Sequence, residues 1–109
     1  MKIELSVIIV NFNGVQYLKE CLDSLYKKLS DIAFEIIVLD NNSSDDSCNF
    51  LKNNYPGVKL IESKINLGFG KRNNEAVKAA QGSFLLLINN DTVVLDSISL
   101  YPSITCWAN

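Results

Sequence analysis

A chain of 109 residues has room for one domain, and 48% of its residues are hydrophobic while 20% are charged. This composition is typical of a globular protein with its own core and excludes a disordered chain. The net charge is −2, with acids and bases interleaved, so no basic surface is available for a nucleic-acid polymer, and we exclude one as a partner. The chain has no histidine, which excludes catalytic triads and metal sites that depend on this residue.

The three cysteines, Cys21, Cys48 and Cys106, are odd in number and have no paired ligand spacing. We interpret them as buried thiols in a reducing cytosol rather than as disulfide partners or zinc ligands. The first apolar stretch is interrupted at Glu4 and is too short for a signal peptide. The longest apolar run, Phe84–Ile88, is far below the roughly 20 residues of a membrane span. We therefore predict a cytoplasmic protein, and any membrane contact would be peripheral, at the inner face of the cell membrane.

Four strands are predicted from short runs rich in apolar and β-branched residues. They are Leu5–Val10, Phe34–Leu39, Val58–Ile61 and Phe84–Ile88. Each run is short and bounded by polar or glycine-containing segments, which is typical of strands buried on both faces.

Three helices are predicted between these strands. Apolar residues recur at steps of three and four from Leu18 to Leu29, which indicates an amphipathic helix. The polar run Ser43–Asp46 supplies a capping signal for a second helix, which Pro56 and Gly57 stop. Asn73–Ala80 reads as the third helix.

The alternation of doubly buried strands with helices predicts a parallel sheet covered by helices on both sides. Right-handed crossovers from a central first strand give the order 3-2-1-4, so we predict an α/β, doubly wound, Rossmann-like half. In this order the fourth strand lacks an outer neighbour, and we expect self-association through its exposed edge. We assign residues 1–96 to this domain and leave residues 97–109, which lack clear periodicity, as an unassigned tail of a truncated chain.

Polar residues gather where the predicted strands end: Asn11 and Asn13 after the first, Asp40–Asp46 after the second and Asn89–Asp91 after the fourth. Each cluster alone is typical of a turn, but the carboxyl ends of parallel strands meet at the edge where α/β sheets bind ligands. A nucleoside diphosphate needs a short acceptor, amides and a cation. Asp40 can accept from a base N–H or a ribose hydroxyl, and the side-chain amides of Asn11 and Asn13 can donate or accept. The alternative for Asp40 is a turn former or a partner of a helix dipole.

Two further positions suit a diphosphate. Asp91 can hold Mg²⁺ or Mn²⁺ together with a substrate diphosphate and waters, or it can simply end its strand in an Asx turn. The loop Gly68–Asn73 lacks the third glycine of a dinucleotide fingerprint and follows the wrong strand, which excludes a nicotinamide site. Its Lys71 and Arg72 could border a phosphate or base at a helix start, or be ordinary solvated cations.

Four blocks of the sequence resemble family 2 glycosyltransferases, especially the rhamnosyltransferase-like branch. They are Leu5–Asn13, Ile37–Asp45, Asn66–Gly70 and Leu85–Thr92. They occur in the family's order and cover the chain from Leu5 to about Leu95. The resemblance implies a GT-A fold, a divalent metal cofactor, and inverting transfer of a sugar from a nucleotide donor such as a UDP- or dTDP-sugar.

The resemblance also implies roles for individual residues. The base and ribose pocket would be lined by Asn11, Asn13, Asp40 and Asn42 and bordered by Gly68 and Arg72. The family's acidic-x-acidic motif would be formed by Asn89, Asn90 and Asp91. Asp91 would then bind the metal that bridges the diphosphate. Asn89 departs from the motif by replacing its first acid, so its expected role is a hydrogen bond to ribose or water.

The implied acceptor is a glycan or a lipid-linked molecule in the synthesis of a cell-surface polysaccharide. Family members place the catalytic base downstream of the metal motif, whereas the only acid after Asp91 is Asp96, which suits a helix cap better. We therefore expect an incomplete chain that binds donor without its catalytic base. Two alternatives stay open: a non-catalytic nucleotide-binding α/β module, and an inactive gene remnant that keeps the fold.

Overall fold

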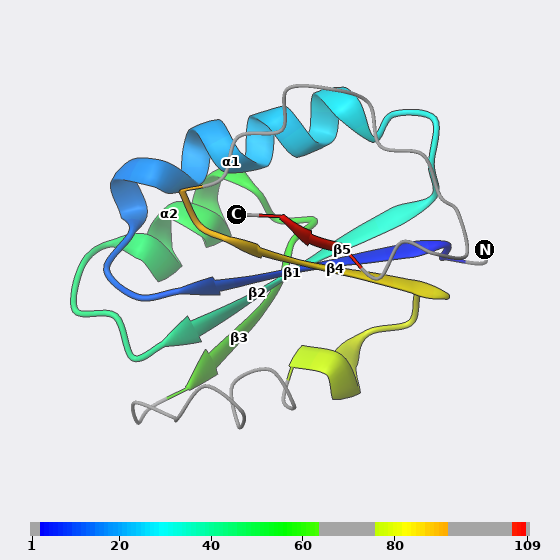
Figure 1. The fold of residues 1–109 in the computed structure, drawn as a ribbon. Helices are drawn as coiled ribbons and strands as arrows, with labels where there is room; N and C mark the ends of the chain where they lie inside the picture. Colours follow the sequence, from blue (N-terminus) through cyan, green and yellow to red (C-terminus); the bar gives the residue numbers. More distant parts are fainter. Residues whose placement is uncertain (1–2, 64–75, 92–105, 109) are drawn as a thin grey trace.

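Five parallel strands form a single sheet in the order β3-β2-β1-β4-β5 in a computed structural model that describes residues 3–63, 76–91 and 106–108 (Figure 1). The strands are β1 (Leu5–Asn11), β2 (Phe34–Asn41), β3 (Lys59–Ser63), β4 (Phe84–Asn89) and β5 (Cys106–Ala108). Every neighbouring pair is parallel. The first four strands confirm the predicted order 3-2-1-4.

The predicted strands end one or two residues too early at their carboxyl ends. Asn11 still pairs with Asp40 across β1 and β2, and Asn89 pairs with Val10 across β1 and β4. Ladder hydrogen bonds therefore carry the strand conformation into residues whose side chains read as turn formers. This extension aligns the polar ends of three neighbouring strands at one edge.

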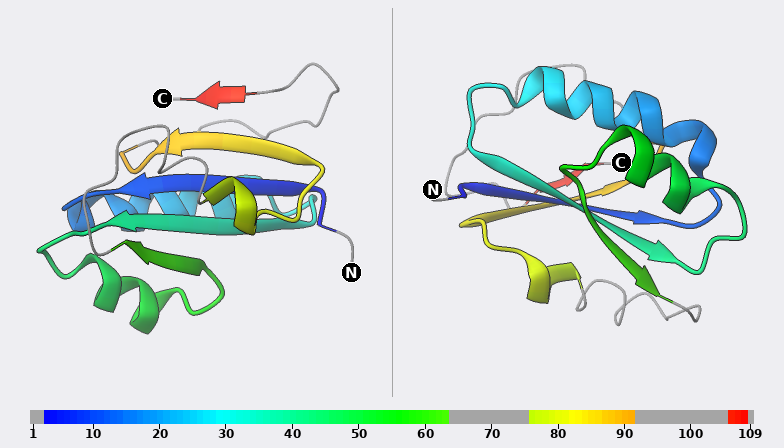
Figure 2. Two further views of the ribbon diagram at one scale, coloured as in Figure 1. Left: turned by 90° about the horizontal axis from the view of Figure 1, so that it is seen from below. Right: turned by 180° about the vertical axis from the view of Figure 1, so that it is seen from behind.

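Helices cover both faces of the sheet, as predicted (Figure 2). α1 (Val15–Lys28) and α2 (Ser47–Asn54) lie on one face, while the helical residues 76–79 lie on the other. Residues 76–79 belong to the predicted third helix, whose residues 73–75 fall outside the described part of the chain. Within the described residues, no helix combines the length and apolar character needed to span a bilayer.

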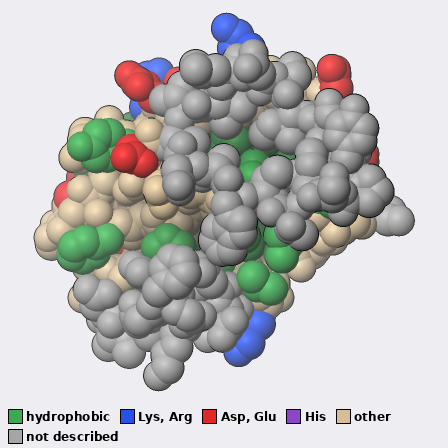
Figure 3. Space-filling model, in the orientation of Figure 1, with side chains coloured by type: hydrophobic (Ala, Val, Ile, Leu, Met, Phe, Trp, Pro, Cys, Tyr) green, Lys and Arg blue, Asp and Glu red, His purple; other side chains and the backbone are tan. Residues whose placement is uncertain are grey.

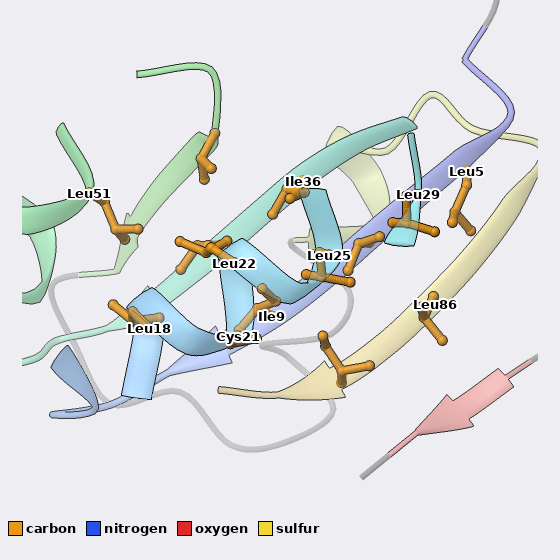
Figure 4. Packing of buried hydrophobic residues seen from close by; sticks show 14 residues of the cluster. Leu5, Ile9, Leu18, Cys21, Leu22, Leu25, Leu29, Ile36, Leu51 and Leu86 are labelled. Atoms are coloured by element: carbon orange, nitrogen blue, oxygen red, sulfur yellow. The ribbon is translucent and has the colours of Figure 1, made fainter. Parts of the chain in front are cut away.

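Alternating side chains of β1 build a core on each side of the sheet. Ile9 packs with Leu22 and Leu25 of α1 (Figure 4), whereas Ile8 packs with Ala76 on the opposite face. Period-two alternation therefore places every second residue of a central strand on the α1 face. The same alternation determines which side of the sheet the polar strand ends face.

The expectation that β4 forms the sheet edge is wrong, because β5 pairs with it. Cys106 lies opposite Leu86 and Ala108 opposite Ile88. A three-residue strand has too short a pattern to be recognised, and its partner lies some 20 residues earlier in the chain. The edge of β4 on which the expected self-association depended is therefore covered. Three residues of the tail that was left unassigned belong to the sheet.

The cysteine interpretation holds for Cys21 and only partly for Cys48. Cys21 of α1 is fully buried against the sheet, whereas Cys48 near the start of α2 is half-buried, and both are free thiols. The side chain of Cys106 lies outside the described set. Charged side chains of both signs are scattered over the described part of the surface that Figure 3 shows, as expected from a net charge of −2.

The amino-terminal edge of the sheet is held by its own polar contacts. Ser6 Oγ donates to Glu35 Oε2 over 2.6 Å and accepts from the N–H of Gly82 over 2.8 Å. Lys59 Nζ lies 3.2 Å from Glu35 Oε1. A β-carbon at Gly82 would lie 2.6 Å from the backbone nitrogen of Ser6, so this glycine is required by a close backbone approach. These contacts lie at the opposite edge from the predicted ligand site.

Candidate functional site

Asn11, Asp40 and Asn90 stand side by side at the carboxyl edge of the sheet. Asn11 and Asp40 are paired across β1 and β2, and Asn90 directly follows the pair formed by Val10 and Asn89. The asparagine of β1 is fully buried and Asp40 is 2% exposed. Buried polar groups are stable only when they are hydrogen-bonded, and these three residues bond to one another.

The side chain of Asn11 connects its two neighbours. Its Nδ2 donates to Asp40 Oδ1 over 2.9 Å, and its Oδ1 accepts from Asn90 Nδ2 over 2.8 Å. A β-carbon at Gly14 would lie 1.9 Å from Asn90 Nδ2, so the loop after β1 needs glycine for this contact to exist. The structure thus brings together three of the residues predicted for the site, but pairs them with one another rather than leaving each free for a ligand.

Ser43 completes the contacts of Asp40 and was missed by sequence reasoning as an individual residue. Its Oγ donates to Asp40 Oδ1 over 2.7 Å and its N–H donates to Asp40 Oδ2 over 3.0 Å. The same Oγ accepts from the N–H of Asn13 over 2.8 Å. A serine three residues after a strand-ending aspartate is the available signal, because short side chains of this spacing close turns on the backbone.

Asn13 joins the two loops that follow β1 and β2. Its Oδ1 accepts from the N–H of Ser44 over 2.7 Å and from the N–H of Asp45 over 3.2 Å. Both Asn13 and Asn42 adopt left-handed backbone conformations, with φ of 51° and 61°, which asparagine tolerates better than most residues. Asn42 is exposed. The predicted pocket residue Asn13 therefore has a bracing role in addition to any ligand contact.

The carboxylate of Asp45 connects the amino ends of both helices on this face. It accepts from the N–H of Val15 in α1 over 3.1 Å and from the N–H of Ser47 in α2 over 3.0 Å. Burial by itself would raise the pKa of Asp45, but the hydrogen bonds from Ser47 and Val15 outweigh it and hold the pKa below its usual value. Asp46 occupies the N-cap of α2 without a side-chain cap bond, so the predicted capping signal acts through Asp45.

Asn89 and Asp91 are exposed on either side of the half-buried Asn90. The carbonyl oxygen of Asn89 lies 4.0 Å from the thiol of Cys21 in α1. Burial, with the nearby charge of Asp91, raises the pKa of Cys21 to about 12. The described residues contain no group of three acidic, cysteine or histidine side chains that could enclose a metal. A single exposed carboxylate fits a divalent cation that arrives with a diphosphate and keeps several waters.

Two predicted site residues, Gly68 and Arg72, lie outside the described part of the chain. Phe12 was missed by sequence reasoning. It lies between Asn11 and Asn13 and is 49% exposed, which is unusual for a phenylalanine beside a sheet edge. Its position in the turn after the first strand is the signal that could have identified it.

A parallel α/β sheet with polar side chains gathered at the carboxyl ends of neighbouring strands is the architecture of nucleotide-binding α/β proteins. Comparison with known families makes the assignment specific. A family model described as "Glycosyl transferase family 2" matches residues 6–104, and the chain belongs to this family. The family resemblance read from the sequence is confirmed, while the rhamnosyltransferase-like branch stays a prediction.

Two curated relatives share about a third of the aligned residues. One is the poly(ribitol-phosphate) beta-glucosyltransferase of Bacillus spizizenii, 33% identical over 96 residues that make up 84% of this chain and 15% of the relative. The other is the poly(ribitol-phosphate) beta-N-acetylglucosaminyltransferase TarS of Staphylococcus aureus, 32% identical over 93 residues that make up 82% of this chain and 16% of TarS. The chain thus spans about a sixth of the length of either relative.

Solved structures show the same fold. The complex of S. aureus TarS 1–349 with UDP superimposes with a TM-score of 0.75 at 29% identity, over 87% of this chain and 29% of that one. The mannosyltransferase PcManGT of Pyrobaculum calidifontis, in complex with GDP-Man and Mn²⁺, gives a TM-score of 0.74 at 22% identity, over 85% of this chain and 29% of that one. The second similarity extends to the fold alone. Together these structures confirm the predicted GT-A arrangement of the first four strands.

Proposed function

We propose that this chain binds the nucleotide-sugar donor of an inverting sugar transfer, with a UDP- or dTDP-sugar as the donor. The observation that carries the proposal is the polar layer formed by Asn11, Asp40 and Asn90 at the carboxyl edge of three neighbouring strands. The structure of TarS in complex with UDP-GlcNAc, which has 30% identity and a TM-score of 0.71, supports a uridine nucleotide. The names of the curated relatives, which mention poly(ribitol-phosphate), support a polymer as the acceptor. The family resemblance is the basis for proposing a glycan or lipid-linked acceptor in cell-surface polysaccharide synthesis.

The nucleoside is proposed to bind over the loops after β1 and β2. Asp40 Oδ2 has lone-pair capacity beyond its bond from the N–H of Ser43, so it can accept from a base N–H or a ribose hydroxyl. The amides of Asn13 and Asn42 can supply donors at the rim. The exposed ring of Phe12 offers a face on which a base can stack, an interaction worth about 1–3 kcal/mol per base in nucleic-acid complexes.

The diphosphate is proposed to bind beside the turn after β4. Asp91 would hold a Mg²⁺ or Mn²⁺ ion, with Asn89 and Asn90 as hydrogen-bonding neighbours. When bound, the metal supplies positive charge that stabilises the departing nucleoside diphosphate. Gly68 and Arg72 keep the role that the family resemblance gives them, as a border of the pocket.

We assign no catalytic base to this chain, because the only acid after Asp91 in the sequence is Asp96. The residues of this chain bind and orient the donor, so that the face of the anomeric carbon opposite the diphosphate is open to an acceptor hydroxyl. The proton of that hydroxyl must pass to a group that we do not place here. We propose the inner face of the cell membrane as the place of action.

Calorimetric titration of UDP and of dTDP, with and without Mn²⁺, tests the proposal. We expect binding to the wild-type chain to depend on Mn²⁺, and to be lost in Asp40→Ala and Asp91→Ala. Asp31→Ala is the matched control, because Asp31 is an exposed acid in the turn before β2, at the opposite edge of the sheet. A folded wild-type chain that binds neither nucleotide would refute the proposal and leave the inactive remnant as the better interpretation.

A further inference from the structure

We infer that Asn11 is a positioning residue, whose amide links the nucleoside side of the site at Asp40 to the diphosphate side at Asn90. The effect that we expect on ligand binding rests on the proposed function. The structural basis of the inference is independent of any ligand, because it follows from hydrogen bonds of the buried Asn11 to Asp40 and to the half-buried Asn90. Asn11 is assigned here to act through its two neighbours rather than by touching the donor.

Asn11 is fully buried, and both ends of its amide are occupied by Asp40 and Asn90 at 2.9 and 2.8 Å. Its Nδ2 also lies 3.4 Å from Ser43 Oγ. An amide that is fully buried and bonded at both ends is not exposed to a nucleotide, so Asn11 is placed behind the residues that would line the pocket rather than among them.

The Asn11 amide can take only one orientation between its two neighbours. A carboxylate only accepts hydrogen bonds, so Asp40 requires that Asn11 turn its NH₂ group toward β2. The carbonyl oxygen of Asn11 must then face β4, and it requires that Asn90 present its own NH₂ group. A reversed amide at position 11 would place oxygen against oxygen on one side and NH₂ against NH₂ on the other. The charge of Asp40 therefore sets the orientation of Asn90, two strands away.

The loop before α1 approaches the Asn90 amide closely. The position of the Asn90 amide is open only because residue 14 is glycine, since a β-carbon there would also lie 2.7 Å from Asn11 Oδ1. The orientation of Asn90 is thus fixed from two sides, by hydrogen bonding and by shape. Because Asn90 directly precedes Asp91, a change at Asn11 should alter the turn that carries the proposed metal ligand.

A nuclear magnetic resonance experiment without nucleotide tests the connection itself. The side-chain amide resonances of Asn90 should shift in Asp40→Asn, although Asp40 and Asn90 share no hydrogen bond. The same substitution should leave these resonances unchanged when it is introduced into Asn11→Leu. The inference would be overturned if Asp40→Asn left the Asn90 amide resonances unchanged in the wild-type background. It would also be overturned if Asp40→Asn still shifted them in the Asn11→Leu background.

A binding cycle tests the functional consequence, with UDP and Mn²⁺ as the probe. Asn11→Leu and Asn90→Leu should each weaken binding about tenfold, which corresponds to the loss of roughly one hydrogen bond. If Asn11 acts through Asn90, the double variant should also bind about tenfold more weakly, rather than about a hundredfold. A loss of about a hundredfold in the double variant would contradict the inference, and so would wild-type affinity for UDP in a folded Asn11→Leu chain.

Ser6→Ala is the matched control for loss of stability. Ser6 is another fully buried polar residue of β1, but its hydrogen bonds lie at the amino-terminal edge. This variant should lower the unfolding temperature and leave the dissociation constant for UDP unchanged. If the wild-type chain binds no UDP, the proposed function fails, and the resonance experiment still decides whether Asn11 connects its neighbours.

Discussion

Gly14 and Asn90 approach each other so closely that a β-carbon at position 14 would lie 1.9 Å from Asn90 Nδ2. Real β-carbons essentially never come this near to another heavy atom, so a side chain at position 14 requires movement of the loop or of the amide. The contact joins the turn after β1 to the turn after β4. Both turns border the proposed donor site.

Gly14→Ala should therefore destabilise the chain and weaken UDP binding together. Overpacking of this kind costs about 1–3 kcal/mol, which urea denaturation can measure. Gly57→Ala is the matched control, because the nearest atom to its β-carbon would be Tyr26 Oη at an ordinary 3.9 Å. A Gly14→Ala chain with wild-type stability and affinity would show that the close approach has no consequence.

Asp40→Ala should lower the free energy of unfolding even in the absence of a ligand. The substitution leaves the buried NH₂ group of Asn11 and the hydroxyl of Ser43 without their shared acceptor, at a cost of about 2–4 kcal/mol. Asp31→Ala, which changes an exposed acid in the turn before β2, should change stability by no more than about 0.5 kcal/mol. Equal urea midpoints for the two variants would argue against a structural role of Asp40.

The fold could be predicted from the sequence because its strands are local and strongly patterned. Phe34–Leu39 is apolar except at Glu35, and the helix before it shows clear amphipathic spacing. The strand ends could not be predicted to the residue, because pairing with neighbours extends them through Asn11 and Asn41. β5 escaped prediction because three residues carry no periodicity and its partner is distant in sequence.

The edge at which the candidate site residues gather could be predicted, but the contacts that each residue makes could not. Residue type identifies Asn11 and Asp40 as hydrogen-bonding groups, whereas only the register shows that they bond to each other. The bracing of Asn13 depends on two loops whose relative position is a property of tertiary structure. The turn position of Phe12 can be read from the sequence, but its exposed ring, on which the proposed stacking depends, cannot.

Asp45→Asn should reduce stability at neutral pH and have a progressively smaller effect in acid. The pKa of Asp45 in the folded chain lies below the ordinary value of about 3.9 expected in the unfolded chain. Its contribution is therefore complete above that unfolded value and is lost as the pH falls through the folded pKa. Urea denaturation at pH 7 and in steps between about pH 4.5 and 2 measures the difference.

Asp31→Asn, which changes an exposed acid in the turn before β2, is the comparison for that experiment. The difference in free energy of unfolding between wild type and Asp45→Asn should become smaller as the pH falls. A difference that stays constant over the whole pH range would show that the substitution removes packing contacts and not a charge interaction. A difference that widens in acid would contradict the predicted sign.

The thiol of Cys21 should be almost unreactive while the chain is folded. The side chain is fully buried against the sheet, and burial with the charge of Asp91 raises its pKa to about 12, so the reactive thiolate is scarce near neutral pH. In a Cys48→Ser/Cys106→Ser background, an aromatic disulfide reagent should label Cys21 at least about a hundredfold more slowly than in urea, because labelling requires opening of α1. Burial raises the pKa of Cys48 to about 12 as well, so a variant that retains only this thiol should label faster in native buffer because it is half-buried rather than fully buried. Equal rates for Cys21 in native buffer and in urea would mean that α1 does not pack stably on β1 and β4, and the carboxyl edge would then lack the support on which the proposed donor site depends.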